Sequence, residues 1–255
     1  MGLARRWWAS VSEPVLSVLF PPRCVGCGDF ETHLCLSCRE GLKGAGDDSC
    51  PRCGEPGPQA LVAGRCAACM GKELAYAGAR GAFLHEGVAR KLVAEFKYGG
   101  QPVLGSVMAE LARAAFACFL ARTGHGDRVL VTWVPCHRTS QRERGYNQAE
   151  VLARFLASDL ALVTAALAWK PRATKHQKGL GRAGRQENLR GVFAIDRTET
   201  LRVPPHTEAL VLVDDVFTTG ATAREVSSVL VEGTGLPVYV FTFSRAVAGT
   251  PERHD

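Results

Sequence analysis

The sequence has no long hydrophobic run: no window reaches the roughly 18 consecutive apolar residues that a transmembrane helix needs. It also shows no secretion signal, because the apolar run in residues 1–20 is broken by Ser12, Glu13 and Pro14 and does not end at a small-residue cleavage site. We therefore expect a cytoplasmic protein. Residues 1–20 carry a hydrophobic face that predicts a short amphipathic helix packed on the rest of the protein. Binding of this helix to a membrane surface is the less favoured alternative.

Cysteine is nearly absent outside one short region. Eight of the ten cysteines form four Cys-x-x-Cys pairs, namely Cys24/Cys27, Cys35/Cys38, Cys50/Cys53 and Cys66/Cys69. A disulfide framework would need an oxidising compartment, whereas two such pairs supply the four thiolates of one tetrahedral zinc site. We predict two structural zinc sites, with iron–sulfur clusters as the less favoured alternative. Pairing in chain order is the simplest assignment, and interleaved pairing remains open.

Glycine follows two of these pairs directly. Gly28 and Gly54 are predicted to adopt positive φ, so that the backbone can turn and its N–H groups face the sulfurs.

The excess of positive charge is confined to one segment. The chain has 31 basic and 25 acidic residues, a net charge of +6. Residues 170–190 contain seven cations and one anion, which accounts for that whole excess. The cations are Lys170, Arg172, Lys175, Lys178, Arg182, Arg185 and Arg190. A segment this basic and polar is typical of a mobile arm with an anionic partner, and a solvated surface loop is the alternative.

The basic segment also contains a G-x-G-x-x-G pattern at residues 179–184. This pattern marks a dinucleotide site only when a buried strand precedes it. Residues 173–178 (ATKHQK) are polar and cationic, so we reject that interpretation.

The most informative stretch is residues 209–222 (ALVLVDDVFTTGAT). It begins as a continuous apolar run typical of a buried parallel strand. Asp214 and Asp215 end this run, and a turn rich in hydroxyl groups and glycine then leads into a predicted helix. Such a turn places N–H groups and hydroxyls at a helix N-terminus, where an anion is favoured. We predict a phosphate-binding turn beside two carboxylates; an ordinary turn with a Thr222–Glu225 capping box is the alternative.

A second polar turn, residues 135–148, also follows an apolar strand and should lie at the same edge of the sheet. Its arginines Arg138, Arg142 and Arg144 are suited to bidentate hydrogen bonds with a pyrophosphate, although a basic loop facing water is the alternative. Cys136 lies beside His137, but adjacency in sequence does not establish a thiol nucleophile, and we interpret Cys136 as a packing residue.

Strands and helices alternate along the remainder of the chain. Strands are predicted at residues 74–84, 129–134, 160–169, 192–195, 210–213 and 238–243, and helices at 86–98, 103–122, 147–157 and 222–232. This alternation predicts an α/β fold with a mainly parallel twisted sheet and flanking helices, preceded by a small cysteine-rich zinc-ribbon domain.

Residues 211–222 (VLVDDVFTTGAT) resemble the signature of type I phosphoribosyltransferases, which bind phosphoribosyl pyrophosphate. The resemblance implies that Asp214 and Asp215 hold the ribose hydroxyls. It also implies a ligand-binding role for the turn formed by Val216, Phe217, Thr218, Thr219, Gly220, Ala221 and Thr222, with residues 218–222 around the 5′-phosphate. The loop of Pro135, Cys136, His137 and Arg138 would contact pyrophosphate, and residues 170–190 would be a flexible basic hood.

Taken together, the paired cysteines, FKYG at residues 96–99, RERGYNQ at 142–148, NLRGVF at 188–193 and the phosphoribosyl motif resemble the ComF family of competence-associated proteins. The resemblance covers about residues 19–245. It implies a zinc-ribbon domain at residues 21–72 and a phosphoribosyltransferase-like domain at 73–248, after the helix in 1–20. No segment matches a base-specificity pocket of the salvage enzymes, which leaves the acceptor open.

Two functions follow as expectations. The first is a phosphoribosyltransferase that uses Mg²⁺ with phosphoribosyl pyrophosphate, in nucleotide metabolism or DNA uptake. Asp214 and Asp215 would stabilise the ribose, while Arg138, Arg142, Arg144, Arg172 and Lys175 would face the diphosphate. The second is a non-catalytic accessory of natural transformation that binds single-stranded DNA through the basic arm and the zinc ribbons, together with other DNA-uptake proteins.

Overall fold

The computed structural model describes residues 21–46, 48–57, 62, 64–171 and 191–247. The helix predicted in residues 1–20 lies outside the described residues. So does most of the basic segment, including the predicted ligand residues Arg172 and Lys175.

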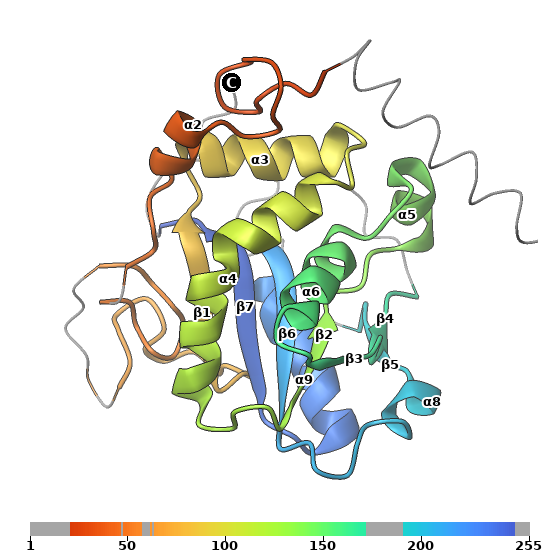
Figure 1. The fold of residues 1–255 in the computed structure, drawn as a ribbon. Coiled ribbons are helices and arrows are strands. Elements are labelled where there is room, and N and C mark those ends of the chain that lie inside the picture. The colour runs from red at the N-terminus through yellow and green to blue at the C-terminus, as the bar shows by residue number, and fades with distance from the viewer. Residues whose placement is uncertain (1–20, 47, 58–61, 63, 172–190, 248–255) are drawn as a thin grey trace, which may run out of the picture.

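A five-stranded sheet forms the centre of the protein (Figure 1). Its strand order is β1 (Gly78–Leu84), β7 (Val238–Arg245), β6 (Ala209–Phe217), β2 (Val129–Trp133) and β3 (Val163–Thr164). All four pairings in this sheet are parallel, which confirms the predicted mainly parallel sheet.

Helices cover both faces of the sheet (Figure 1). Helices α3 (Gly87–Tyr98), α4 (Leu104–Thr123) and α6 (Gln148–Ser158) pack on one face, and α9 (Ala221–Thr234) packs on the other. Alternate residues of β6 point to opposite faces of the sheet. Val211 and Val213 belong to the hydrophobic core shared with α3, α4 and α6, and Leu210 and Leu212 belong to the core shared with α9. The near-continuous apolar sequence of this strand is therefore explained by burial on both faces.

Helix α4 is long and apolar enough to span a bilayer by length and composition, and among the described residues it alone meets that test. Its Phe116 is buried and packs against Phe241 of β7, with ring centroids 4.9 Å apart. Core helices of water-soluble proteins pass the same test, and this contact is of the kind they make.

The strand predicted at residues 160–169 forms two short strands instead. β3 extends the main sheet, whereas β4 (Ala168–Trp169) pairs antiparallel with β5 (Ala194–Ile195) in a separate two-stranded sheet. A short apolar run does not specify its partner strand, so the change of sheet could not be read from the sequence. Three short helices were also not predicted: α2 (Leu36–Glu40), α5 (Arg138–Arg144) and α8 (Arg197–Thr200).

Strand β6 is longer than predicted. It continues past the two aspartates to Phe217, because β7 accompanies it to the register Phe217↔Arg245. The partner on its other side, β2, stops at the register Trp133↔Val213, just before Pro135 turns the chain away. From Asp214 onward β6 therefore has no partner strand on the β2 side. The sequence predicted this edge of the sheet at Asp214, although β6 itself continues to Phe217.

Helix α9 begins one residue earlier than predicted, at Ala221. Gly220 is its N-cap residue, with φ of 73°. Thr222 thus lies inside the first turn, and the Thr222–Glu225 capping box considered from the sequence does not form.

Candidate functional site

Four thiols from the first two cysteine pairs converge on one point. The sulfurs of Cys24, Cys27, Cys35 and Cys38 all lie within 4.8 Å of one another. Gly28 adopts φ of 89°, as predicted, but its amide donates to the Cys24 carbonyl oxygen at 2.8 Å. The amide of Cys35 instead donates to the Cys24 sulfur at 3.3 Å. This is a closed set of four thiol ligands, and it fits a structural zinc site.

The remaining four cysteines, Cys50, Cys53, Cys66 and Cys69, form a second cluster within the same limit of 4.8 Å. This confirms pairing in chain order and rules out the interleaved alternative for the described residues. Burial opposes ionisation of the Cys50 thiol, but backbone N–H groups of Cys53, Cys66 and Arg52 lower its pKa to about 7. An ionised sulfur is the form that binds metal.

Among the described residues, the second cluster has little other core. Its buried apolar residues there are the four cysteines themselves, with Ala68 and Leu74 packed against them. We expect native mass spectrometry to find two zinc ions per chain, and Cys66→Ser to lose one of them together with much of the structure of residues 50–69. A single zinc ion in the unaltered protein, or two in the variant, would contradict this assignment.

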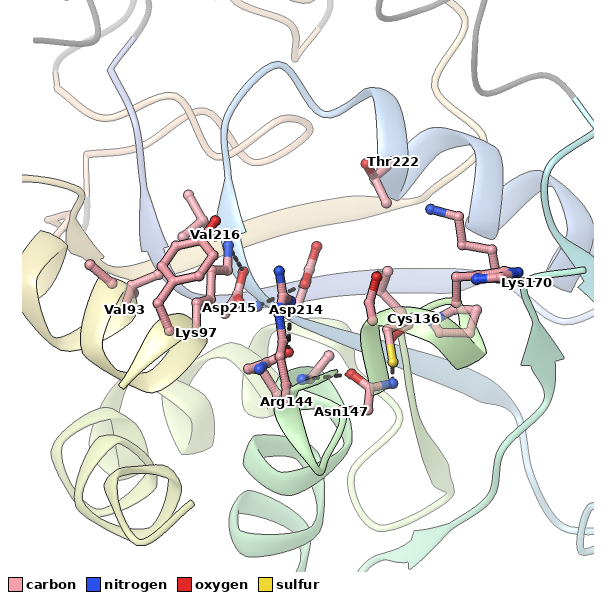
Figure 2. A pocket seen from close by; sticks show the side chains of 18 of the residues that line it. Val93, Lys97, Cys136, Arg144, Asn147, Lys170, Asp214, Asp215, Val216 and Thr222 are labelled. Carbon is pink, nitrogen blue, oxygen red and sulfur yellow. Dashed lines mark hydrogen bonds and ion pairs between the residues drawn. The ribbon is translucent and has the colours of Figure 1, made fainter. Parts of the chain in front are cut away.

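A cavity of about 690 Å³ lies at the carboxyl ends of the strands, and Asp214 and Asp215 of β6 form part of its wall (Figure 2). Its walls come from β6, the end of α3, the loop after β2 and the first turn of α9. The view shows Asp214 between the Lys97–Asp215 pair on one side and Cys136 and Lys170 on the other. Polar residues from segments far apart in sequence therefore line one cavity, as the sequence predicted for the turns after β2 and β6.

Asp215 forms an ion pair inside the protein. Its Oδ1 atom lies 2.9 Å from the Nζ atom of Lys97, and the aspartate side chain is only 8% exposed. Burial disfavours the charged lysine, but Asp215 and Asp214 outweigh it and raise the pKa of Lys97. Lys97 therefore stays charged and fixes the orientation of Asp215.

Asp214 is in the opposite situation. Burial and the nearby Asp215 charge raise the pKa of Asp214 to about 7, and Lys97 offsets only part of that shift. Its Oδ1 atom accepts a hydrogen bond from the Asp215 amide at 2.9 Å. The chain thus holds a carboxyl group at the cavity wall in an environment that disfavours its charge, which is common at functional sites.

A small hollow of about 30 Å³ adjoins the large cavity and is lined by consecutive residues of the predicted phosphate turn. Those residues are Val216, Phe217, Thr218, Thr219, Gly220, Ala221 and Thr222. The hydroxyl of Thr219 accepts from the Ala221 amide at 3.4 Å, and the first amides of α9 have no partner within the helix. Phe217 is 5% exposed, and its ring packs directly against Gly220 of the turn. A Cβ on Gly220 would lie 2.5 Å from the Cζ atom of this ring.

The loop after β2 contributes only some of its predicted residues. Pro135, Cys136, His137 and Arg144 line the cavity, whereas Arg138 and Arg142 do not. The cause is the short helix α5, which turns these two arginines outward to solvent. Arg144 donates to Gln148 Oε1 at 3.2 Å, and Asn147 holds the loop through a hydrogen bond to the Val134 carbonyl at 3.1 Å. Burial raises the pKa of the Cys136 thiol.

Two lysines of the site, Lys97 and Lys170, are not among the ligand residues predicted from the sequence. Lys97 sits in the last turn of α3, where a lysine usually serves only the helix dipole, so its position gave no indication of a ligand site. Lys170 lines the cavity beside Cys136, at the start of the basic segment, and burial lowers its pKa. In the sequence, Lys97 belongs to the FKYG stretch, which indicates only the family resemblance.

These features define a protein with a double zinc ribbon joined to an α/β domain whose polar cavity lies at the carboxyl edge of a parallel sheet. Residues 15–70 match the family described as the double zinc ribbon domain. The chain is 28% identical over 218 residues to Competence protein F of Haemophilus influenzae, covering 82% of this chain and 90% of that protein.

Two further relatives extend the comparison. DNA utilization protein YhgH of Salmonella typhi is 26% identical over 205 residues, covering 78% of this chain and 84% of that protein. Competence protein ComFC of Bacillus subtilis is 23% identical over 220 residues, covering 85% of each chain. The double zinc ribbon match and the names of these relatives support the resemblance to the ComF family.

Proposed function

We propose that the cavity binds a 5-phosphorylated ribose, with phosphoribosyl pyrophosphate as the principal candidate. The observation that carries this proposal is the adjacency of two carboxylates and a hollow lined by hydroxyl groups and glycine at the start of α9. Carboxylates suit a sugar diol, and amides at a helix N-terminus suit a phosphate. The hollow is small and one acid is already paired with Lys97, so ligand binding includes an adjustment of the turn and of that pair.

In this arrangement the 5′-phosphate lies against residues 218–222 and the diol lies at Asp214 and Asp215. Lys97 pairs with Oδ1 of Asp215, so that the second carboxylate oxygen of Asp215 can accept from a hydroxyl group. The diphosphate extends toward the loop after β2, where Arg144, His137 and Lys170 line the wall. Arg138 was predicted for this role from the sequence, and Arg144 takes it in the proposal because it reaches the cavity.

Transfer of the phosphoribosyl group builds positive charge on the sugar as the diphosphate leaves. The carboxylates stabilise the sugar, and the cationic wall stabilises the leaving group. Magnesium would supply further charge neutralisation on the diphosphate oxygens. Of the acids lining the cavity, Asp215 is engaged by Lys97, so the ion would be held mainly by the ligand and water.

Titration calorimetry with phosphoribosyl pyrophosphate and Mg²⁺ tests the binding. We expect saturable heat from the unaltered protein. Asp214→Asn should lower the affinity at least tenfold, because the variant loses an acceptor for the diol. Asp159→Asn is the matched control, since Asp159 ends α6 and pairs with Arg113 at 2.8 Å. No heat in the unaltered protein, or an equal effect of both variants, would contradict the proposal. Phosphorus NMR of the same mixture then separates binding from breakdown.

The names of the relatives support a place for this binding in DNA uptake or DNA utilization. Direct binding of single-stranded DNA is the second candidate function, favoured by the same names and by the concentration of positive charge in residues 170–190. Its affinity should fall steeply with salt, and the slope should decrease when those cations are neutralised. A flat salt dependence would exclude this second function.

A further inference from the structure

One buried ion pair joins the second zinc ribbon to the α/β domain. Arg245, the last residue of β7, donates from Nη2 to Oε2 of Glu55 at 2.9 Å, and the side chains are only 4% and 8% exposed. Glu55 lies two residues after the predicted zinc ligand Cys53. Its carbonyl accepts from the Cys50 amide at 2.9 Å, so metal binding by this ribbon fixes the position of the glutamate.

The second zinc ribbon packs closely against the sheet near Arg245. A Cβ on Gly54 would lie 2.5 Å from the carbonyl oxygen of Ala79 in β1, and one on Gly81 would lie 2.7 Å from Cβ of Arg245. These close approaches leave little room for the turn at Cys53 or the Arg245 side chain to shift independently of the strands.

The other side of the guanidinium faces the ligand turn. Its Cζ atom lies 4.2 Å from the centroid of the Phe217 ring, and Tyr76 packs edge-on against the same ring at 6.2 Å. The far edge of the ring supports Gly220, the residue that starts α9 and lines the hollow. A continuous series of contacts therefore runs from the zinc-ligand turn through Glu55, Arg245 and Phe217 to the phosphate turn.

The chemistry of the pair points to positioning rather than to stability. Two guanidinium nitrogens of Arg245, Nε and Nη1, are buried with no hydrogen-bond partner among the described residues. Such a buried pair contributes little net stability compared with apolar residues of the same volume, and its best-attested use is to fix one arrangement of neighbouring parts.

We propose that Arg245 is a positioning residue that couples the second zinc ribbon to the phosphate turn. Zinc holds Glu55, Glu55 holds the guanidinium under Phe217, and Phe217 holds Gly220 in the shape that accepts a phosphate. Because coupling between the affinities of two sites is reciprocal, a ligand in the turn tightens the binding of zinc by this ribbon. This inference rests on the proposed binding of a phosphorylated ribose.

The test uses the full-length zinc-loaded protein and follows alkylation of individual cysteines by mass spectrometry during a chelator challenge. Saturating phosphoribosyl pyrophosphate with Mg²⁺ should slow modification of Cys50, Cys53, Cys66 and Cys69 about tenfold, within the usual range of allosteric coupling. The first ribbon is the internal reference and should change much less.

Glu55→Gln should abolish this protection and weaken ligand affinity about tenfold. Glu110→Gln is the matched control, because Glu110 pairs with Arg39 at 2.8 Å and links the first ribbon to α4. Phe217→Leu removes the ring and leaves the ion pair intact; it should lose the same affinity and protection. It also decides the question if Glu55→Gln fails to fold.

The outcomes separate the two proposals. If the unaltered protein binds the ligand but neither variant loses affinity or zinc protection, the coupling is wrong and the binding function stands. If the unaltered protein does not bind phosphoribosyl pyrophosphate, the proposed function fails and the coupling fails with it.

Discussion

Replacing Gly220 by alanine should weaken binding of phosphoribosyl pyrophosphate by about 100-fold or more. Gly220 has φ of 73°, a left-handed conformation that costs a residue with a side chain about 1–2 kcal/mol. The added methyl group would also lie 2.5 Å from Cζ and 2.8 Å from Cε1 of Phe217, which is buried and cannot move freely. The turn must therefore shift, and a loss of about 2.8 kcal/mol already corresponds to 100-fold in affinity. Titration calorimetry measures the change.

Gly235→Ala is the control for backbone strain. Gly235 has φ of 71° at the other end of the same helix, and nothing lies within 4 Å of an added Cβ. This variant should lose about 1–2 kcal/mol of unfolding free energy and keep its ligand affinity. Equal affinities for the two variants would show that the Gly220 turn does not contact the ligand.

Asp214→Asn should stabilise the ligand-free protein at neutral and alkaline pH. The pKa of Asp214 is raised from 3.8 to about 7 by burial and by the Asp215 charge. Between these values the folded protein keeps a proton that the unfolded chain has released, so stability falls as pH rises through this window. Asparagine cannot ionise, and the gain should grow from pH 4 to pH 7 and then level off at about 2–4 kcal/mol. Chemical denaturation at several pH values measures it.

Asp215→Asn should have the opposite effect at pH 8. It removes the ion-pair partner of Lys97, whose Nζ atom lies 2.9 Å from Asp215 Oδ1, and leaves a largely buried cation without its paired carboxylate. We expect a loss of about 1–3 kcal/mol. Equal destabilisation by both substitutions would show that Asp214 is a structural residue. A gain in stability on losing Asp214 is the pattern expected of a residue retained for binding.

The features that sequence predicted well are local. Cys-x-x-Cys spacing and short intervening loops were enough to assign two metal clusters in chain order. The apolar runs located the central strands because burial on both faces leaves a continuous hydrophobic pattern. A polar turn follows each of two apolar strands, and this pattern was enough to predict that Asp214 and the loop after β2 lie at the same edge of the sheet.

The features that sequence missed depend on distant partners or on local helix geometry. The Glu55–Arg245 pair joins residues 190 positions apart, and neither residue lies in a recognisable motif. Arg138 and Arg142 were expected at the ligand, but they are four residues apart on α5 and so share one face of that helix. Arg144, the last residue of α5, lines the cavity instead.

A crystal structure of the zinc-loaded protein with phosphoribosyl pyrophosphate and Mg²⁺ would show whether the turn before α9 holds the ligand. We expect electron density for the 5′-phosphate within residues 218–222 and for the ribose diol at Asp214 and Asp215, with Lys97 still near the Asp215 carboxylate. Density for the ligand elsewhere on the protein, with the Lys97–Asp215 pair unchanged and no phosphate in the turn, would show that this cavity is not the ribose-phosphate site.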